Sequence, residues 1–285
     1  MTAAIRRYES VVIAQQQLSA SLYLLTLGDV ADLAIAAQPG QFVQVDCGPS
    51  CSVPRPISIF STDPISGTIT LFYRVVGVGT RALSLHPVGS RVTLFGPLGR
   101  PFSVGSDGAS VVLIAGGIGL APLHFLAQRL PQKTVLFWGI EEASPWPVVS
   151  ASAPMVGIPA DVHASLSIMA PMGVVSRMSS LTPQPGFFQG YVTQLAAGYL
   201  MALSPSERCR TTLAVCGPLP MMRAAADLAH RLGLSGEVSL EERMACGFGG
   251  CAGCVAPIAE GSEWYYRRVC LEGPVFSLSQ VIWQP

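Results

Sequence analysis

The chain has 285 residues, of which 50% are hydrophobic and only 12% are charged, and its 17 basic side chains balance 17 acidic ones. A neutral chain of this kind lacks the clustered Lys and Arg that nucleic acid requires. The mean hydropathy of +0.47 suggests a membrane protein. However, the longest apolar run, residues 111–126, is interrupted by glycine, proline and histidine and is shorter than the roughly 20 residues of a spanning helix. We therefore predict neither nucleic-acid binding nor a membrane span.

The N-terminal sequence, "MTAAIRRYES", has no apolar signal core, so we expect a cytoplasmic protein. Disulfides are disfavoured in that compartment, and clustered cysteines there more often hold metal. A chain of this length exceeds what one core usually contains, so we expect two or three domains.

The first hundred residues contain short segments of alternating hydrophobicity, separated by Gly, Pro, Asp and Ser. Alternation of this kind predicts β-strands, and regular spacing of short strands favours a small barrel. We predict an antiparallel β-barrel over residues 1–103, with strands in "SVVIAQQQ", "SLYLLTLG", "GQFVQVDCG", "GTITLFYRVV" and "SRVTLFGP".

From residue 110 the pattern changes to a continuous apolar strand, a glycine turn and a helix, followed by another strand at residues 133–140. Residues 211–234 repeat the order of strand, turn and helix. This alternation predicts an α/β doubly wound sheet over residues 104–236. The stretch 141–204 is poorly periodic and supports no assignment. Residues 237–285 are predicted to form a small domain that carries cysteines.

Cys246, Cys251 and Cys254 form a C-x4-C-x2-C pattern, and Cys270 follows after a loop. This is the plant-type spacing of a [2Fe–2S] cluster, in which four thiolates hold two irons. The glycines between these cysteines allow the backbone to turn its N–H groups toward anionic sulfur. A structural zinc site and uncoordinated thiols are the alternatives, although zinc sites usually show two separated C-x2-C pairs.

Gly116, Gly117 and Gly119 lie between a buried strand and a helix. They would allow a pyrophosphate to approach the N-terminus of that helix, although tight strand-to-helix turns need glycine for structural reasons too. The next strand ends just before Glu141 and Glu142. A carboxylate there, for which Glu141 is our candidate, would bind a ribose diol and favour NADH over NADPH. A solvated acidic loop is the alternative.

Arg55 lies between two prolines ahead of a strand, and this rigid setting suits a guanidinium that binds a diphosphate. An exposed arginine on an edge strand is the alternative. Together with other motifs, this segment resembles the ferredoxin-NADP reductase superfamily, which joins a flavin barrel to a nucleotide domain. The resemblance rests on the R-x-x-S signature Arg55, Pro56, Ile57 and Ser58, on the GGxGxxP turn, and on the CGP motif Cys216, Gly217 and Pro218.

The C-terminal segments "LEERMACGFGGCAGC" and "RRVCLEGPVF" resemble the electron-transfer subunits of type B dihydroorotate dehydrogenase, the PyrK family, and this likeness extends over essentially the whole chain. It implies that the barrel binds FAD and that the four cysteines ligate the cluster. The FAD contacts that it implies are Arg55, Pro56, Ile57, Ser58, Phe72, Tyr73, Arg74, Gly79 and Thr80.

Nicotinamide exchanges two electrons at a time and an iron–sulfur cluster exchanges one, so a flavin must stand between them. Ser58 is our candidate for a hydrogen bond near flavin N5, and Cys216, Gly217 and Pro218 are expected to line the nicotinamide pocket. The resemblance implies a partner, the catalytic FMN-containing dihydroorotate dehydrogenase subunit, in a hetero-oligomer with two copies of each chain. It also implies the direction of electron flow in this step of pyrimidine biosynthesis, from dihydroorotate through the cluster and FAD to NAD+.

Two other functions stay open at this stage. One is the reductase subunit of another NAD(P)H-linked iron–sulfur flavoprotein complex, of the ferredoxin reductase, hydrogenase or sulfide dehydrogenase type. The other is a zinc-stabilised binding module on a degenerate reductase fold. Trp264, Tyr265 and Tyr266 lie next to the cysteine segment and would suit a docking face, although such aromatic residues are more often packing residues.

Overall fold

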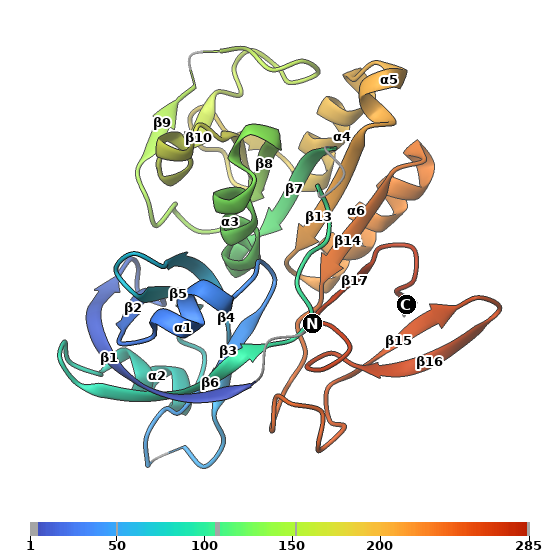
Figure 1. Cartoon of the computed structure of the whole chain (residues 1–285). Coiled ribbons are helices and arrows are strands. Elements are labelled where there is room, and N and C mark those ends of the chain that lie inside the picture. The colour runs from blue at the N-terminus through green and yellow to red at the C-terminus, as the bar shows by residue number, and fades with distance from the viewer. Residues whose placement is uncertain (1–4, 50, 106–108, 152, 284–285) are drawn as a thin grey trace. The chain divides into compact units, whose positions relative to one another are not determined.

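The computed structural model describes residues 5–49, 51–105, 109–151 and 153–283. The chain forms two compact units, shown in Figure 1. The first unit comprises residues 1–102, 124–126 and 240–275, and the second comprises residues 103–123, 127–239 and 276–285. The division into three functional domains at 1–103, 104–236 and 237–285 stays a prediction.

The first unit contains the expected antiparallel barrel. Its strands close in the order β1-β2-β5-β4-β3-β6, and every pair of neighbours is antiparallel. The strands are β1 (Arg6–Gln17), β2 (Leu22–Gly28), β3 (Phe42–Val45), β4 (Arg55–Asp63), β5 (Thr68–Arg74) and β6 (Arg91–Leu98). The helices α1 (Ala31–Ala36) and α2 (Val78–Ser84) belong to the same unit.

The alternation of residues along β5 shows why these segments form a barrel. Ile69, Leu71 and Tyr73 are buried in the barrel core, while Thr70 and Phe72 point to the other face, since successive side chains of a strand alternate. The core is filled mainly by Leu, Ile and Val from all six strands. Burial of such side chains stabilises the fold by about 1.5–3 kcal/mol each.

The second unit contains the expected doubly wound sheet, in the order β12-β11-β8-β7-β13-β14-β17. The neighbours from β12 to β14 pair in parallel. The strands are β7 (Ser110–Gly116), β8 (Thr134–Gly139), β11 (Val175–Ser180), β12 (Phe188–Gln189), β13 (Thr211–Cys216), β14 (Ser235–Ser239) and β17 (Val275–Ser277).

Helices cover this sheet on both faces (Figure 1). The chain passes from β7 to β8 in one direction and from β13 to β14 in the other, so right-handed crossovers place α3 and α6 on opposite faces. Helix α4 packs against α6. The helices are α3 (Leu120–Arg129), α4 (Val192–Ala202), α5 (Pro205–Arg208) and α6 (Leu219–Leu232), with 3-10 turns at Gly117–Gly119, Pro131–Lys133 and Ser167–Met172.

The stretch without a sequence assignment, residues 141–204, contributes β11, β12 and α4 to this layered structure. It also forms a small hairpin from β9 (Val148–Ser150) and β10 (Ala164–Leu166). Near the C-terminus, a second hairpin follows the cysteine loop and is formed by β15 (Val255–Glu260) and β16 (Glu263–Arg268). In the described part of the chain, no helix is long and apolar enough to cross a membrane.

Candidate functional site

Two neighbouring strands of the barrel carry the residues predicted to hold a flavin. Ser58 of β4 is half-buried on the outer face of the barrel. Ile57 and Tyr73 point the other way, into the core, where they are 6% and 3% exposed. These two residues can therefore reach a ligand only through their backbone. The outer face beside Ser58 is formed by Pro56, Phe60, Thr70, Phe72 and Arg74.

Arg55 meets the first turn of α2. A Cβ added to Gly79 would lie 2.7 Å from Arg55 Nε and 2.9 Å from Cys51 Sγ. The Arg55 side chain therefore packs against the start of α2 at a position where a residue larger than glycine would collide with it. The Thr80 hydroxyl accepts hydrogen bonds from the N–H groups of Val76 (3.0 Å) and Gly77 (3.3 Å). A cation beside a helix N-terminus is an arrangement that suits a diphosphate.

In the second unit, the two predicted nucleotide segments end at the same edge of the sheet. Cys216, the last residue of β13, pairs with Ala115 of β7, and Gly116 pairs with Gly139 at the end of β8. The strand order reverses between β7 and β13. Ligands of open α/β sheets bind at such a switch point, outside the carboxyl ends of the strands.

The glycines of these two turns pack directly against each other. A Cβ on Gly119 would lie 2.3 Å from the Cys216 carbonyl oxygen, and one on Gly217 would lie 2.9 Å from the Gly116 nitrogen. A Cβ on Gly116 would lie 2.7 Å from Pro218 Cδ. The structural need for glycine that the sequence left open is therefore present at three of the four positions.

Gly117 differs from the other three glycines. It has φ +52, and no atom lies within 4 Å of the position that its Cβ would occupy. Its carbonyl accepts a hydrogen bond from Trp138 Nε1 at 3.0 Å. Gly117 is thus the position where the backbone is open to a ligand. Glu141 lies exposed in the loop that follows β8, and Cys216 is 1% exposed.

The four cysteines of the C-terminal region lie as two pairs. Cys251 N–H points at Cys246 Sγ (3.4 Å), and Cys270 N–H points at Cys254 Sγ (3.4 Å). Gly249 N–H also donates to Cys270 Sγ, at 3.1 Å. Among the described residues, no group of three or more His, Cys, Asp or Glu side chains is gathered closely enough to hold a single metal ion. The arrangement is therefore two pairs of thiols surrounded by backbone donors.

Cys246 and Cys270 differ in their electrostatics. Burial alone would raise the pKa of Cys246, but hydrogen bonds from the loop, chiefly the N–H of Cys251, outweigh burial and lower this pKa to about 6. Burial, followed by the thiol of Cys254, raises the pKa of Cys270 to about 12. Thiols must lose their protons to bind metal, so Cys246 is better prepared to do so than Cys270.

A barrel residue that the sequence did not indicate lies against this loop. Gln44 of β3 is 1% exposed, and its Nε2 donates to the Ala245 carbonyl at 3.4 Å. The two residues are 201 positions apart in the chain. No local pattern relates them, so only the folded barrel brings them together.

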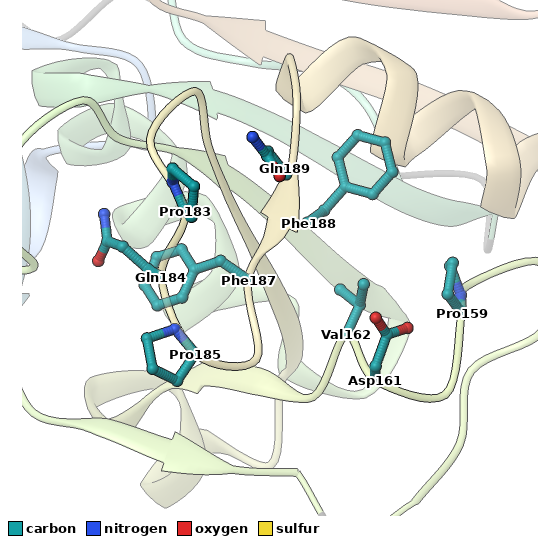
Figure 2. A pocket seen from close by; sticks show the side chains of 9 residues that line it. All are labelled: Pro159, Asp161, Val162, Pro183, Gln184, Pro185, Phe187, Phe188 and Gln189. Carbon is teal, nitrogen blue, oxygen red and sulfur yellow. The ribbon is translucent and has the colours of Figure 1, made fainter.

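A further cavity, of about 530 Å³, belongs to the second unit and contains no predicted site residue. Figure 2 shows that one wall comes from the loop before β10 and the other from β12 and the loop that leads into it. The cavity is lined by Pro159, Asp161, Val162, Pro183, Gln184, Pro185, Phe187, Phe188 and Gln189. All of these residues fall in the stretch that the sequence left unassigned.

Comparison with known proteins decides the family. A domain family described as the iron–sulfur cluster binding domain of dihydroorotate dehydrogenase B matches residues 241–282. A protein of Desulforamulus reducens named dihydroorotate dehydrogenase B (NAD(+)), electron transfer subunit, is 34% identical over 97% of this chain and 98% of its own. This chain belongs to the family of dihydroorotate dehydrogenase B electron transfer subunits. A protein with the same name from Bacillus mycoides is 30% identical over 97% of this chain and 99% of its own.

Family membership confirms the predicted oxidoreductase electron-transfer subunit and its iron–sulfur binding region. Solved structures confirm the reductase fold. An NADH-dependent reduced ferredoxin-NADP oxidoreductase aligns with a TM-score of 0.75 at 20% identity, over 96% of this chain and 90% of its own. The ferredoxin reductase in carbazole 1,9a-dioxygenase aligns with a TM-score of 0.60 at 21% identity, over 82% and 68%.

Proposed function

We propose that this electron transfer subunit binds FAD on the outer face of its barrel, a [2Fe–2S] cluster in its cysteine loop and NAD(H) at the glycine turns of its second unit. Its partner is a catalytic FMN-containing subunit that oxidises dihydroorotate, with two copies of each chain in the complex. The balanced reaction converts dihydroorotate and NAD+ into orotate, NADH and a proton. In this assignment the three functional domains are residues 1–103, 104–236 and 237–285.

The pairing of the four thiols is the observation that carries the proposal. In a two-iron cluster the protein supplies four thiolates, two for each iron. Cys246 with Cys251 and Cys254 with Cys270 match this demand, because in each pair the two thiols interact with each other as well as through a backbone N–H. A single zinc ion instead requires four ligands around one point. Backbone N–H donors directed at sulfur also suit an anionic cluster.

The FAD assignment rests on the barrel face. When bound, FAD would supply a carrier that exchanges hydride with nicotinamide and single electrons with a cluster. Arg55 and the first turn of α2 would bind its diphosphate, and Ser58 would hydrogen-bond at ring N5. The close packing of Arg55 Nε over Gly79, where an added Cβ would lie only 2.7 Å from it, supports this placement, because it holds the guanidinium at the start of α2.

The NAD assignment rests on the carboxyl edge of the sheet. Gly117 leaves the backbone open for a pyrophosphate, and the turn of Cys216, Gly217 and Pro218 flanks it. Glu141 would bind the ribose diol, and its negative charge would repel a 2′-phosphate. NAD is therefore favoured over NADP, in agreement with the names of the relatives.

Co-purification under anaerobic conditions tests this function. The complex is expected to contain FAD, FMN, iron and labile sulfide, and to couple dihydroorotate oxidation to NAD+ reduction. Neither subunit alone should catalyse this coupled reaction. Zinc in place of iron and sulfide, or coupled activity without this chain, would disprove the proposal.

A further inference from the structure

Gln44 lies between the predicted flavin strand and the cysteine loop. On one side it pairs with Pro56 in the ladder between β3 and β4, next to Arg55 and within the R-x-x-S signature. On the other side its amide meets the backbone that flanks Cys246. A Cβ on Gly247 would lie only 2.3 Å from Gln44 Nε2. All of these residues belong to the first unit.

The hydrogen bonds of Gln44 are incomplete. A primary amide has two N–H donors and a carbonyl acceptor. In the described structure, Nε2 makes one long bond of 3.4 Å to the Ala245 carbonyl, and the buried Oε1 has no partner. Because Ala245 offers an acceptor, the atom that faces it must be the amide nitrogen. The second N–H of this buried amide thus remains available against the backbone on either side of Cys246.

Such an incomplete buried amide is costly. A buried polar group without its hydrogen bonds destabilises a protein by about 1–3 kcal/mol, and an apolar side chain at this barrel position would avoid that cost. Sulfur atoms of an iron–sulfur cluster accept hydrogen bonds, and these bonds help to set its reduction potential. A bound cluster would therefore give the second N–H an acceptor and remove that part of the cost, while Oε1 would stay without a donor.

We propose that Gln44 is a positioning residue that ties the flavin strand to the Cys246 side of the cluster and raises the cluster's reduction potential by donating an N–H hydrogen bond to sulfur. This inference rests on the proposed function, because it requires a cluster on the four cysteines. A donor stabilises the reduced cluster more than the oxidised one, since reduction adds negative charge. Gln44 thus makes the cluster a better acceptor for electrons that arrive from the catalytic partner.

The test is a redox titration of the anaerobically purified complex, followed by the electron paramagnetic resonance signal of the reduced cluster. Gln44→Leu removes the amide with little change in size, and Gln44→Glu keeps the shape but replaces the donor with a carboxylate. Gln44→Leu should lower the ratio of reduced to oxidised cluster about tenfold at a fixed potential, which corresponds to about 59 mV for one electron. Gln44→Glu should lower it further, because its charge repels the reduced cluster.

Gln41 supplies the matched control. It is also a buried barrel glutamine, but its Nε2 donates to the Gly99 carbonyl at 2.8 Å and its Oε1 accepts from Gln38 N–H at 2.9 Å. Gln41→Leu should lower the melting temperature without changing the cluster potential. A change in potential equal to that of Gln44→Leu would refute a specific role for Gln44.

The possible outcomes separate this inference from the proposed function. An unchanged potential and signal in both Gln44 variants overturns the inference, even if both melt earlier. A Gln44→Leu protein that retains FAD but loses iron supports it, since only the Cys246 side is disturbed. Loss of FAD and iron together overturns it and assigns Gln44 a role in barrel folding alone. A wild-type complex without iron and labile sulfide would instead refute the proposed function.

Discussion

Gly249 in the cysteine loop and Gly119 in the nucleotide turn each exclude a side chain, but a Cβ would meet different atoms in the two places. At Gly119 the nearest atoms are the backbone carbonyl of Cys216, at 2.3 Å, and the nitrogen that follows it, at 2.7 Å. At Gly249 the nearest atom is the tip of Leu271, at 2.8 Å, and φ is +88. Glycine is therefore needed at position 119 because two backbone segments pack against each other there, and at position 249 because the backbone adopts a positive φ.

This difference indicates how each region is held together. The turns of the second unit interlock through backbone atoms, so their geometry exists without a ligand. The cysteine loop is held by N–H groups that point at sulfur, and metal binding contributes folding energy to such sites. We expect a substitution in one of these regions to leave the structure and ligand binding of the other unchanged, and the following variants test that expectation.

Cys251→Ser should give the largest effect, because it removes one of four thiolates. We expect complete loss of iron and labile sulfide from the purified protein. The second unit and the flavin face are untouched, so hydride transfer from NADH to FAD should persist. Iron and sulfide analysis measures the first result, and stopped-flow bleaching of the flavin absorbance measures the second.

Cys209→Ser is the control for this experiment. Cys209 is an exposed free thiol in the second unit, and its replacement should leave the cluster content unchanged. If Cys251→Ser abolished FAD reduction by NADH as well, the two regions would not be independent.

Gly119→Ala should give the next largest effect, on the second unit alone. The added methyl group cannot avoid the Cys216 carbonyl unless two backbone segments separate, and overpacking of this kind costs about 3 kcal/mol. Chemical unfolding should show this loss, together with weaker NADH binding and a normal iron content. Gly117→Ala, where the space is open, should cost only about 1–2 kcal/mol for its positive φ. Equal losses in the two variants would exclude interlocked turns as the cause.

The sequence predicted well whatever depends on neighbours in the chain. A buried strand, a glycine turn and a helix lie within some twenty residues, so β7, α3, β13 and α6 all follow from local pattern. The spacing of the cysteines likewise identified the cluster-binding region that the family match confirms.

The sequence failed where burial and polarity disagree. Strand β11 is almost wholly buried, yet it reads VSRMSS, so no apolar pattern marks it. Its Ser176 hydroxyl accepts from Leu166 N–H at 2.9 Å, and Arg177 donates to the Ala153 carbonyl at 2.6 Å. These partners lie in a loop and a hairpin that the sequence left unassigned. The contact of Gln44 with the cysteine loop was hidden for a related reason, its separation of 201 residues.

Arg55→Ala should give an intermediate effect, limited to flavin retention. A charge-assisted hydrogen bond to phosphate contributes about 1.5–3 kcal/mol, so FAD should dissociate at lower dilution while the iron content stays normal. Fluorescence of released flavin measures this directly. Arg81→Ala, which removes an exposed cation from the same helix region, should retain FAD normally. Equal loss of FAD from both variants would indicate general charge attraction rather than the contact at Gly79.

Gly249→Ala should give the smallest effect. Alanine at positive φ costs about 1–2 kcal/mol, but Leu271 is 43% exposed, so its Cδ2 atom can rotate away and leave only the milder 3.2 Å contact with Leu271 Cβ. The expected result is a cluster that is lost more readily to a chelator, with an unchanged melting temperature for the second unit.

Gly253→Ala is the matched control for Gly249→Ala in the same loop. The nearest atom to its added Cβ would be Cys251 Sγ, at an ordinary contact distance of 3.6 Å, so chelator resistance should stay at the wild-type level. If Gly249→Ala destabilised the protein as much as Gly119→Ala does, the loop would be packed as rigidly as the turns. The proposed difference between the cysteine loop and the nucleotide turns would then be wrong, because a methyl group beside the Leu271 side chain would cost as much as one against the Cys216 carbonyl.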